Sequence, residues 1–559
     1  MTRLVLASAV RGVLLLLLAV LVLYAPIAAG LRGIADLSLR PSRSLWTPLT
    51  FSVLANTLLV VGASSLLSVF WGGLLAWIQE RTDASLGRWG ELLPLVPLLL
   101  SPLLGAVGMT LLFDPTVGLV NIALRSFAAF LGFPAPAAGP LNVFTPTGLV
   151  LVTTLYLVPY AYLTVSAALR RVDPSLEEAS RTSGAGLCRT LRRVTLPAIV
   201  PSLGAAFLLS MIVGLGLFSI PVVIGLRARI EVLSVYIFQL LEYYPPRTGD
   251  ALVLSGLLLV AVQILLLLHR SLIVPRRHAR LSGGFLQRRT PLGRWRPWVQ
   301  LIAAGYFSLA FAAPLLALAV VSFQPYWSPQ IRWEALSAAN YRELLGSGTP
   351  ARALLNSLIL GIATASLSLL WVAGLALYEE ARSPRSRGTV LEFLTALPAT
   401  FPHLIVGVAL LVAFGRPPLD LRGSPILLLL CYLILSLPFA ARTAFTASTV
   451  IGLELTEASR VFGATSWQTL RRVLLPIARP FLVSGWVIVF VQSASEVTAS
   501  SVLAGSRTPV VGRLMLDLQA YGSYPQLAAM GLVIASVTAV AVAAVLRLGR
   551  SGLDALGTP

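Results

Sequence analysis

The residues best placed to do chemistry in this chain lie in a polar stretch that occurs twice. The first copy runs from Ser175 to Pro197 and the second from Leu453 to Pro476. Each copy holds Glu-Ala-Ser, then a Gly after three more residues, then Leu-Arg-Arg-Val and a final Leu-Pro. The equivalent Glu178 and Glu457 are 279 residues apart (457 − 178), half of the 559-residue chain. A repeat of that length indicates duplication of a whole domain.

The residue types of the first copy predict two short helices joined by a turn. The stretch Leu176–Ser180 favours a short helix. Gly184 permits a sharp turn with positive φ, and Arg189 opens a basic second helix. Pro197 suits the first turn of the next helix, where a missing N–H costs nothing. The simpler interpretation is a solvated loop whose charges signal only exposure.

Both copies resemble the EAA loop of ABC importer permeases, with Ser for the second Ala and Val for the usual Ile. In that family the loop is cytosolic and forms a coupling helix that docks on an ATPase subunit. The resemblance implies two ATPase partners, one for each loop. It implies a coupling role for Glu178, Ala179, Ser180, Gly184, Pro197, Glu457, Ala458, Ser459, Gly463 and Pro476.

Composition places the chain in a bilayer. It is 57% hydrophobic and 11% charged, with a mean hydropathy of +0.85. All 42 basic residues are Arg, so the chain has no Lys for an ATP-binding P-loop, and separate subunits are expected to bind ATP. We expect no cofactor in this chain. The net charge is +20, but the Arg residues do not form a basic stripe with interleaved aromatics, which a nucleic-acid partner requires. The two Cys and three His form no metal-binding pattern.

Twelve apolar runs are long enough to cross a bilayer, which needs about 20 residues per helix. The expected spans are 12–31, 49–78, 92–113, 147–169, 199–226, 251–269, 298–323, 353–377, 390–414, 425–445, 477–503 and 527–546. The fold class is therefore all-α and polytopic, with about 12 transmembrane helices in two parallel six-helix repeats, MetI-like by resemblance. The expected domains are a first half over 1–269, an Arg-rich cytosolic linker over 270–297 and a second half over 298–559.

An even number of spans puts both termini on one side of the membrane. Of the 42 Arg residues, this topology places 28 on the side of the termini and repeated loops and 14 on the other. The positive-inside rule makes the first side cytosolic. We therefore expect a multi-pass protein of the bacterial plasma (inner) membrane with cytosolic termini. The first run could also be a signal peptide cut near Ala29-Gly30, but a retained span fits the topology better. A surface helix over Val117–Phe130 is also expected.

Polar residues gather near the end of the eleventh run. Since polar groups inside a membrane usually face a cavity or a partner, we take four of them as candidate pathway residues. These are Gln492, Ser495, Glu496 and Thr498. The alternative is that these side chains satisfy one another between helices. Asn56 and Asn356 more simply cap or pack helices, and no metal site is expected.

Segments after the fifth and eleventh runs resemble the ferric-iron branch of fused permeases, notably Tyr244-Pro245-Pro246 and Ser495–Ser500. The resemblance implies an ATP-driven importer for ferric iron delivered by an external binding protein. Thiamine, polyamine or phosphonate permeases are alternatives. A secondary transporter is the alternative from another class, and it would need more intramembrane carboxylates than Glu496 alone. A membrane enzyme would need a catalytic constellation that the spans do not supply, so we expect no enzyme.

Overall fold

A computed structural model of the chain describes residues 2–39, 45–133, 138–273, 289–328, 330–346, 348–382, 389–415 and 419–554. Over these ranges the ordered elements are helices, and one isolated bridge pairs Thr82 with Thr290. Most of the predicted linker, residues 274–288, lies outside the described residues.

Within the described ranges, ten continuous helices or helix runs are long and apolar enough to cross a bilayer. Three of these runs contain a one-turn π-helix that joins two α-helices. The elements of the ten are α1 (Thr2–Leu39), α2 (Pro48–Arg81), α6 (Pro146–Leu169), α8–η2–α9 (Leu187–Thr190, Leu191–Thr195, Leu196–Gly216), α11 (Thr248–Ile273), α12–η5–α13 (Arg296–Phe307, Ser308–Ala312, Ala313–Ser322), α15 (Thr349–Arg382), α18 (Pro425–Val461), α19–η8–α20 (Ser466–Thr469, Leu470–Leu474, Leu475–Ala494) and α23 (Tyr524–Asp554).

The third and ninth predicted spans are bent rather than straight. Trp89–Leu98 meets Pro102–Phe113 at 92°, and Val390–Thr400 meets His403–Phe414 at 101°. Pro102 and Pro402 lie at the two bends, and proline disfavours the helical conformation of the residue before it. Counted as one span each, the pairs bring the total to the twelve expected, which confirms the predicted fold class. Their elements are α3 (Gly87–Leu92), η1 (Leu93–Leu99), α4 (Pro102–Phe113), α16 (Thr389–Ala396), η7 (Leu397–Thr400) and α17 (His403–Phe414).

The fifth and eleventh spans end earlier than the apolar runs suggest. α9 ends at Gly216 and α20 at Ala494, and short helices follow each break. Hydropathy alone could not find the break after Gly216, since apolar residues continue past it, whereas the polar residues after Ala494 were interpreted as part of a span. The remaining short elements are α5 (Leu119–Phe130), α7 (Pro174–Thr182), η3 (Pro221–Gly225), α10 (Leu233–Glu242), η4 (Gly293–Trp295), η6 (Trp333–Ala335), α14 (Ala339–Gly346), α21 (Thr498–Leu503) and α22 (Val511–Ala520).

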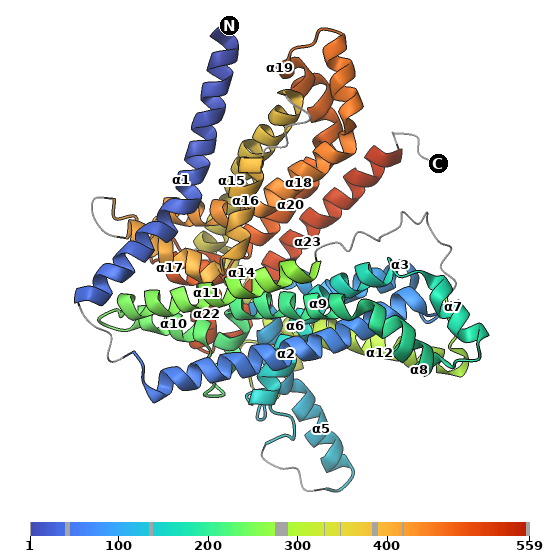
Figure 1. Cartoon of the computed structure of the whole chain (residues 1–559). Coiled ribbons are helices and arrows are strands. Elements are labelled where there is room, and N and C mark those ends of the chain that lie inside the picture. Colours follow the sequence, from blue (N-terminus) through green and yellow to red (C-terminus); the bar gives the residue numbers. More distant parts are fainter. Residues whose placement is uncertain are drawn as a thin grey trace. The chain divides into compact units, whose positions relative to one another are not determined.

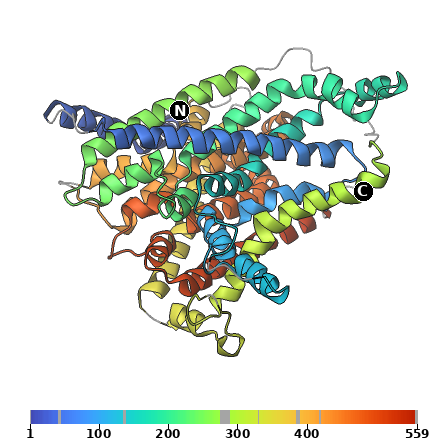
Figure 2. The same ribbon diagram turned by 90° about the horizontal axis from the view of Figure 1, so that it is seen from below.

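The segment predicted to form a surface helix is helical, over α5 (Leu119–Phe130). It packs mainly against α4 and stands apart from α2, α6 and α9 in two views (Figures 1 and 2). Its base is held by the buried Asn121, whose amide donates to the carbonyls of Asp114 at 2.9 Å and Leu141 at 2.6 Å. Phe127 and Phe130 are exposed on its outer part.

The packed units do not follow the order of the sequence. One unit comprises Met1–Ser42, Leu240–Gly256 and Ala338–Pro559, and in it α15, α18 and α20 lie side by side while α1 packs against α17 (Figure 1). The other unit comprises Arg43–Gln239 and Leu257–Ser337, and in it α2, α6 and α9 pack together while α13 packs against α4.

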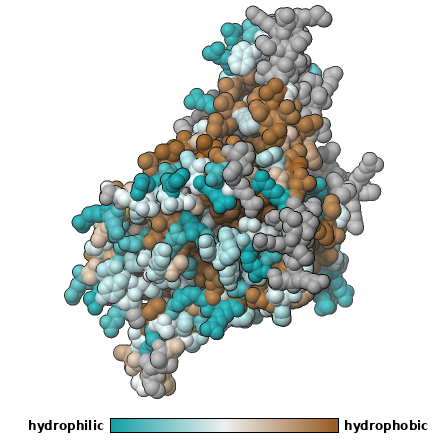
Figure 3. Space-filling model, turned by 90° about the vertical axis from the view of Figure 1, so that its left-hand side faces the viewer, coloured by the Kyte–Doolittle hydropathy of each residue, from teal (hydrophilic) through white to brown (hydrophobic). Residues whose placement is uncertain are grey.

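Close helix contact in the second of these units depends on a small residue. A Cβ at Gly72 of α2 would lie 2.7 Å from the backbone nitrogen of Tyr162 in α6. Small residues permit such approach between membrane helices, where packing rather than the hydrophobic effect drives association. Large apolar side chains point outward instead, such as Leu66 and Phe70 of α2. On one face of the molecule, hydrophobic residues cover an extended area beside a hydrophilic one (Figure 3), as expected of a surface in contact with lipid.

Two matched polar anchors hold the helices that follow the span breaks. The Thr57 hydroxyl of α2 accepts from the backbone N–H of Leu233 at 2.8 Å, where α10 begins. The Ser357 hydroxyl of α15 accepts from the N–H of Val511 at 2.9 Å, where α22 begins. Beside them, the Asn56 and Asn356 side chains donate to the carbonyls of Glu231 at 3.4 Å and Pro509 at 2.8 Å. Both Asn side chains therefore join helices, which is the packing role that was one of the two expected for them, and neither caps a helix end in these contacts.

Removing either hydroxyl leaves a buried N–H without its acceptor, which costs about 1–3 kcal/mol. We therefore expect Thr57→Val and Ser357→Ala each to lower the thermal unfolding midpoint of the purified chain in detergent. Thr57→Ser and Ser357→Thr keep the oxygen and are the matched controls. If Thr57→Val and Thr57→Ser have the same unfolding midpoint, this hydrogen bond does not contribute to the stability of the chain.

Candidate functional site

The first repeated loop, Ser175–Pro197, folds as two short helices and a turn. Helix α7 starts after Asp173, whose carboxylate accepts from the N–H of Ser175 at 2.9 Å. It ends at Thr182, and Gly184 in the turn that follows has φ +82°. Helix α8 and the π-turn η2 then lead into α9, with Pro197 in the first turn of that helix. The predicted helix, turn and Pro position are thus all present.

The second repeated loop, Leu453–Pro476, has the same turn but a different entry. Helix α18 runs without a break from Pro425 to Val461, so the span itself extends into the loop. The turn follows at Gly463, with φ +78°. Thr465 and Gln468 form a reciprocal capping box at the start of α19. Pro476 lies in the first turn of α20.

Both turns are Schellman motifs. The N–H groups of Gly184 and Ala185 donate to the carbonyls of Arg181 (2.9 Å) and Ser180 (3.1 Å). In the second loop, the N–H groups of Gly463 and Ala464 donate to Arg460 and Ser459 at the same distances. A residue in the left-handed region is required at this position, which favours glycine. No atom lies within 4 Å of a Cβ built at either Gly, so backbone conformation rather than space selects it.

The Ser that replaces the usual second Ala has a structural role in both loops. The hydroxyls of Ser180 and Thr190 lie 3.0 Å apart, and those of Ser459 and Thr469 lie 2.9 Å apart. Each pair joins the first short helix to the second. Sequence reasoning missed the two Thr residues, although both follow their Ser by ten positions, a spacing visible in the repeat.

Glu178 and Glu457 both have surface exposed on the outside of their loops. Glu178 is partly exposed, and its carboxylate makes no hydrogen bond or ion pair with a residue in the described part of the chain; Glu457 is exposed. The neighbouring Ala179 and Ala458 are exposed as well. Large apolar side chains accompany the second loop, where Phe462 is 90% and Trp467 62% exposed. Such a patch outside the membrane-crossing segment is typical of a protein-binding surface.

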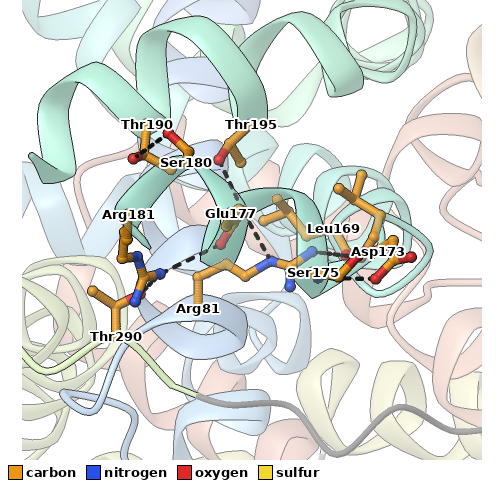
Figure 4. Close-up of polar contacts among 11 residues, drawn as sticks. Arg81, Leu169, Asp173, Ser175, Glu177, Ser180, Arg181, Thr190, Thr195 and Thr290 are labelled. Carbon is orange, nitrogen blue, oxygen red and sulfur yellow. Dashed lines mark hydrogen bonds and ion pairs between the residues drawn. The ribbon is translucent and has the colours of Figure 1, made fainter. Parts of the chain in front are cut away.

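The buried carboxylate of the first loop belongs to Glu177, one residue before the Glu predicted from the motif. Its side chain is 7% exposed and accepts from the Thr195 hydroxyl at 2.8 Å. Two guanidinium groups lie at ion-pair distance, Arg81 at 3.6 Å and Arg181 at 3.7 Å (Figure 4). The spacing of the repeat pointed to Glu178, because Glu177 matches Thr456 in the second loop, and only the tertiary structure brings Arg81 beside Glu177.

Arg81 joins three elements at the end of α2. Its side chain is 5% exposed and donates to the carbonyls of Leu169 at 2.7 Å and Val172 at 2.8 Å, where α6 ends (Figure 4). The preceding Glu80 accepts from Arg170 at 2.8 Å, and this hydrogen bond raises the pKa of the Arg170 guanidinium. Two adjacent side chains of α2 therefore fasten the point at which α6 stops.

The candidate pathway residues divide among α20, the break that follows it and the start of α21. Gln492 is exposed on α20, and the Ser495 hydroxyl donates to the carbonyl of Val491 at 2.6 Å. Glu496 lies in the break after α20 rather than inside a straight span, which corrects the expected placement. Its buried carboxylate accepts from the N–H groups of Ala499 (2.8 Å) and Ser500 (2.9 Å), close to Thr498 at the start of α21.

The Glu496 carboxylate therefore satisfies the open end of α21, since the first N–H groups of a helix have no partner within it. His403 at the start of α17 lies 3.5 Å from the same carboxylate. A Cβ at Gly512 of α22 would lie 2.1 Å from the Glu496 carbonyl oxygen. The absence of a side chain there allows α22 to pack directly on this break.

Comparison with known proteins identifies the family. The model of the family described as binding-protein-dependent transport system inner membrane component matches residues 68–277 and 371–551, more than half of the chain, with one repeated loop in each segment. The putative ferric transport system permease protein of Haemophilus influenzae is 26% identical over 475 residues, covering 82% of this chain and 71% of that protein. The ferric transport system permease protein of Actinobacillus pleuropneumoniae is 25% identical over 493 residues, covering 86% of this chain and 69% of that protein.

Among solved structures, the crystal structure of a bacterial alginate ABC transporter in complex with an alginate pentasaccharide-bound periplasmic protein contains a similar chain. The match has a TM-score of 0.40 and 18% identity, and it covers 50% of this chain and 96% of that chain. The family is established by the match of its model to two separate segments. This chain therefore belongs to the family of binding-protein-dependent transport system inner membrane components, as a multi-pass membrane permease that carries the MetI-like domain twice.

Proposed function

We propose that this chain supplies both permease halves of an ATP-driven importer that receives its substrate from an external binding protein. The observation that carries the proposal is the repeated loop, which has the same turn and the same Ser–Thr contact in both copies. Two equivalent loops suit two ATPase subunits, with one loop docked on each. The chain has no Lys for a P-loop, so ATP binds to those partners.

The proposed domain arrangement is a first half over 1–269, a linker over 270–297 and a second half over 298–559. The proposed location is the bacterial inner membrane, with both termini and both repeated loops in the cytosol. The support is the distribution of Arg, with 28 of 42 on that side. On this side of the membrane both loops can also reach ATPase subunits, which bind cytosolic ATP.

The proposed mechanism is alternating access. ATP draws two ATPase subunits together, and each loop transmits that movement to the helices on either side of it. ATP and substrate favour different states of the permease, so each shifts the population of conformations. We propose that the break after α20 lines the pathway, with Gln492, Ser495 and Thr498 near it and Glu496 holding its backbone.

Ferric iron is the proposed substrate. The two relatives described above are named ferric transport permeases, and each aligns with more than four-fifths of this chain. Iron is cargo here, and the binding protein supplies most of its specificity. Thiamine, polyamines and phosphonates are the alternatives. A secondary transporter is disfavoured, because it has no need of two loops shaped to bind partners.

Glu178 and Glu457 test the proposed docking. A charge-assisted contact contributes about 1.5–3 kcal/mol, equivalent to about 10- to 100-fold in affinity. Glu178→Ala and Glu457→Ala should each weaken retention of the ATPase on purification, and the double variant should abolish substrate uptake. Membrane abundance should stay normal, because these side chains lie outside the bilayer. Full uptake by the double variant at normal abundance would contradict the docking role.

The loop turn offers a matched pair of glycines. Gly184 has φ +82°, whereas Gly186 has φ −68° and an equally open environment. Val is strained at the first position and acceptable at the second. We expect Gly184→Val to reduce uptake at least tenfold and Gly186→Val to reduce it less than twofold, measured at equal abundance. An equal loss of uptake in both variants would show that the loop excludes the larger side chain itself, rather than the strained backbone conformation.

Uptake measurements decide the substrate. Cells that lack their other iron importers should take up labelled ferric iron when they carry this chain with its partner subunits. The Glu178→Ala, Glu457→Ala double variant should fail to restore that uptake. Uptake of labelled thiamine should be independent of the chain. If the chain restores thiamine uptake and leaves iron uptake unchanged, thiamine replaces ferric iron as the substrate.

A further inference from the structure

The two repeated loops connect to their spans in different ways. In the second loop, α18 continues from the membrane through Val461, so the direction of the span sets the direction of the loop helix. In the first loop, α6 ends at Leu169, and Asp173, which precedes Pro174 at the start of α7, is extended with φ −63° and ψ 119°. A residue before proline avoids the helical region. Helix α7 therefore cannot take its direction from α6.

The buried carboxylate of the first loop has no counterpart at the equivalent position of the second. Glu177 of the first loop corresponds to Thr456 of the second (456 − 177 = 279), and Thr195 corresponds to Leu474 (474 − 195 = 279). Thr456 and Leu474 are both 0% exposed, so the position is buried in both loops. The first loop thus places a carboxylate and its hydroxyl partner where the second loop places a threonine and a leucine.

The end of the inter-half linker reaches the same cluster. Thr290 is buried and exchanges backbone hydrogen bonds with the end of α2, donating to Arg81 at 2.9 Å and accepting from Asp83 at 3.1 Å. Its hydroxyl accepts from Arg181 (Figure 4). The Asp83 carboxylate also accepts from the N–H of Leu292 at 3.0 Å. The chain is therefore fastened to the first loop at the point where the linker enters the second half.

A buried ion pair is poor evidence for stability, because desolvation offsets much of the attraction, but it can specify one arrangement over others. We infer that Arg81 and Glu177 are positioning residues that replace helix continuity in the first repeated loop, and that Thr290 ties the linker to them. Arg81 holds the end of α6, and Glu177 holds α7 against Arg81 and against the π-turn at Thr195. The consequence for transport rests on the proposed docking function of the loop.

Hydrogen–deuterium exchange of the full chain in detergent tests the positioning directly. Glu177→Gln and Arg81→Gln should each speed exchange over residues 174–195 about tenfold, as expected for loss of a charge-assisted contact. Thr290→Val should give a smaller increase in the same segment and is the milder variant if the other two fold poorly. Exchange over residues 454–474 should not change, which makes the second loop the internal control.

Glu91→Gln is the matched control, because Glu91 also pairs with an Arg but is 52% exposed. It should leave exchange unchanged. Unchanged exchange over 174–195 in all three test variants, or an equal rise in both loops, would overturn the inference.

ATPase retention and uptake are measured separately. Faster exchange with normal uptake and retention would uphold the positioning and refute the docking function of the loop, whereas lost uptake with unchanged exchange would refute the positioning.

Discussion

Backbone N–H and C=O groups inside a bilayer have no water to bind, so each place where a span stops being a helix needs an internal partner. Several spans of this permease are interrupted, and at several of the exposed helix ends a specific side chain hydrogen-bonds to the backbone. The Glu496 carboxylate binds the open N–H groups of α21. Thr57 and Ser357 accept the N–H groups at the starts of α10 and α22. The polar residues near the breaks are thus required by the backbone, whatever else they contact.

Duplication left two copies of one loop, and several positions are the same in both. The Gly of each turn has positive φ, and the Ser and Thr that join the short helices are the same in both loops. The loops differ where the second loop is held in place by a different structural feature. A continuous α18 makes a buried carboxylate unnecessary at Thr456, whereas the break before Pro174 makes Glu177 useful.

Packing divides the chain differently from the repeat. α1 packs against α17 of the second half, and α13 packs against α4 of the first. The first helix of each half therefore joins a unit made mostly of the other half. Fusion into one chain then has a structural consequence at Thr290, where the connection between the halves is paired with the end of α2. Two separate subunits would contain no such contact.

The sequence by itself determined the class, the number of spans, the duplication and the loop turns, because these depend on composition and on local spacing. The spans follow from hydropathy averaged over a window of residues. The loop turns follow from a single Gly, because a positive φ is a requirement of the local backbone. The bends at Pro102 and Pro402 follow from the prolines in the sequence. The break after Gly216 could not be predicted, since apolar residues continue through it, and the polar residues after Ala494 suggested a pathway rather than a break. The spacing of the repeat identified Glu178, but only the tertiary structure showed that Glu177 is the buried carboxylate. The reason is Arg81, a residue 96 positions away (177 − 81) that folding brings beside Glu177.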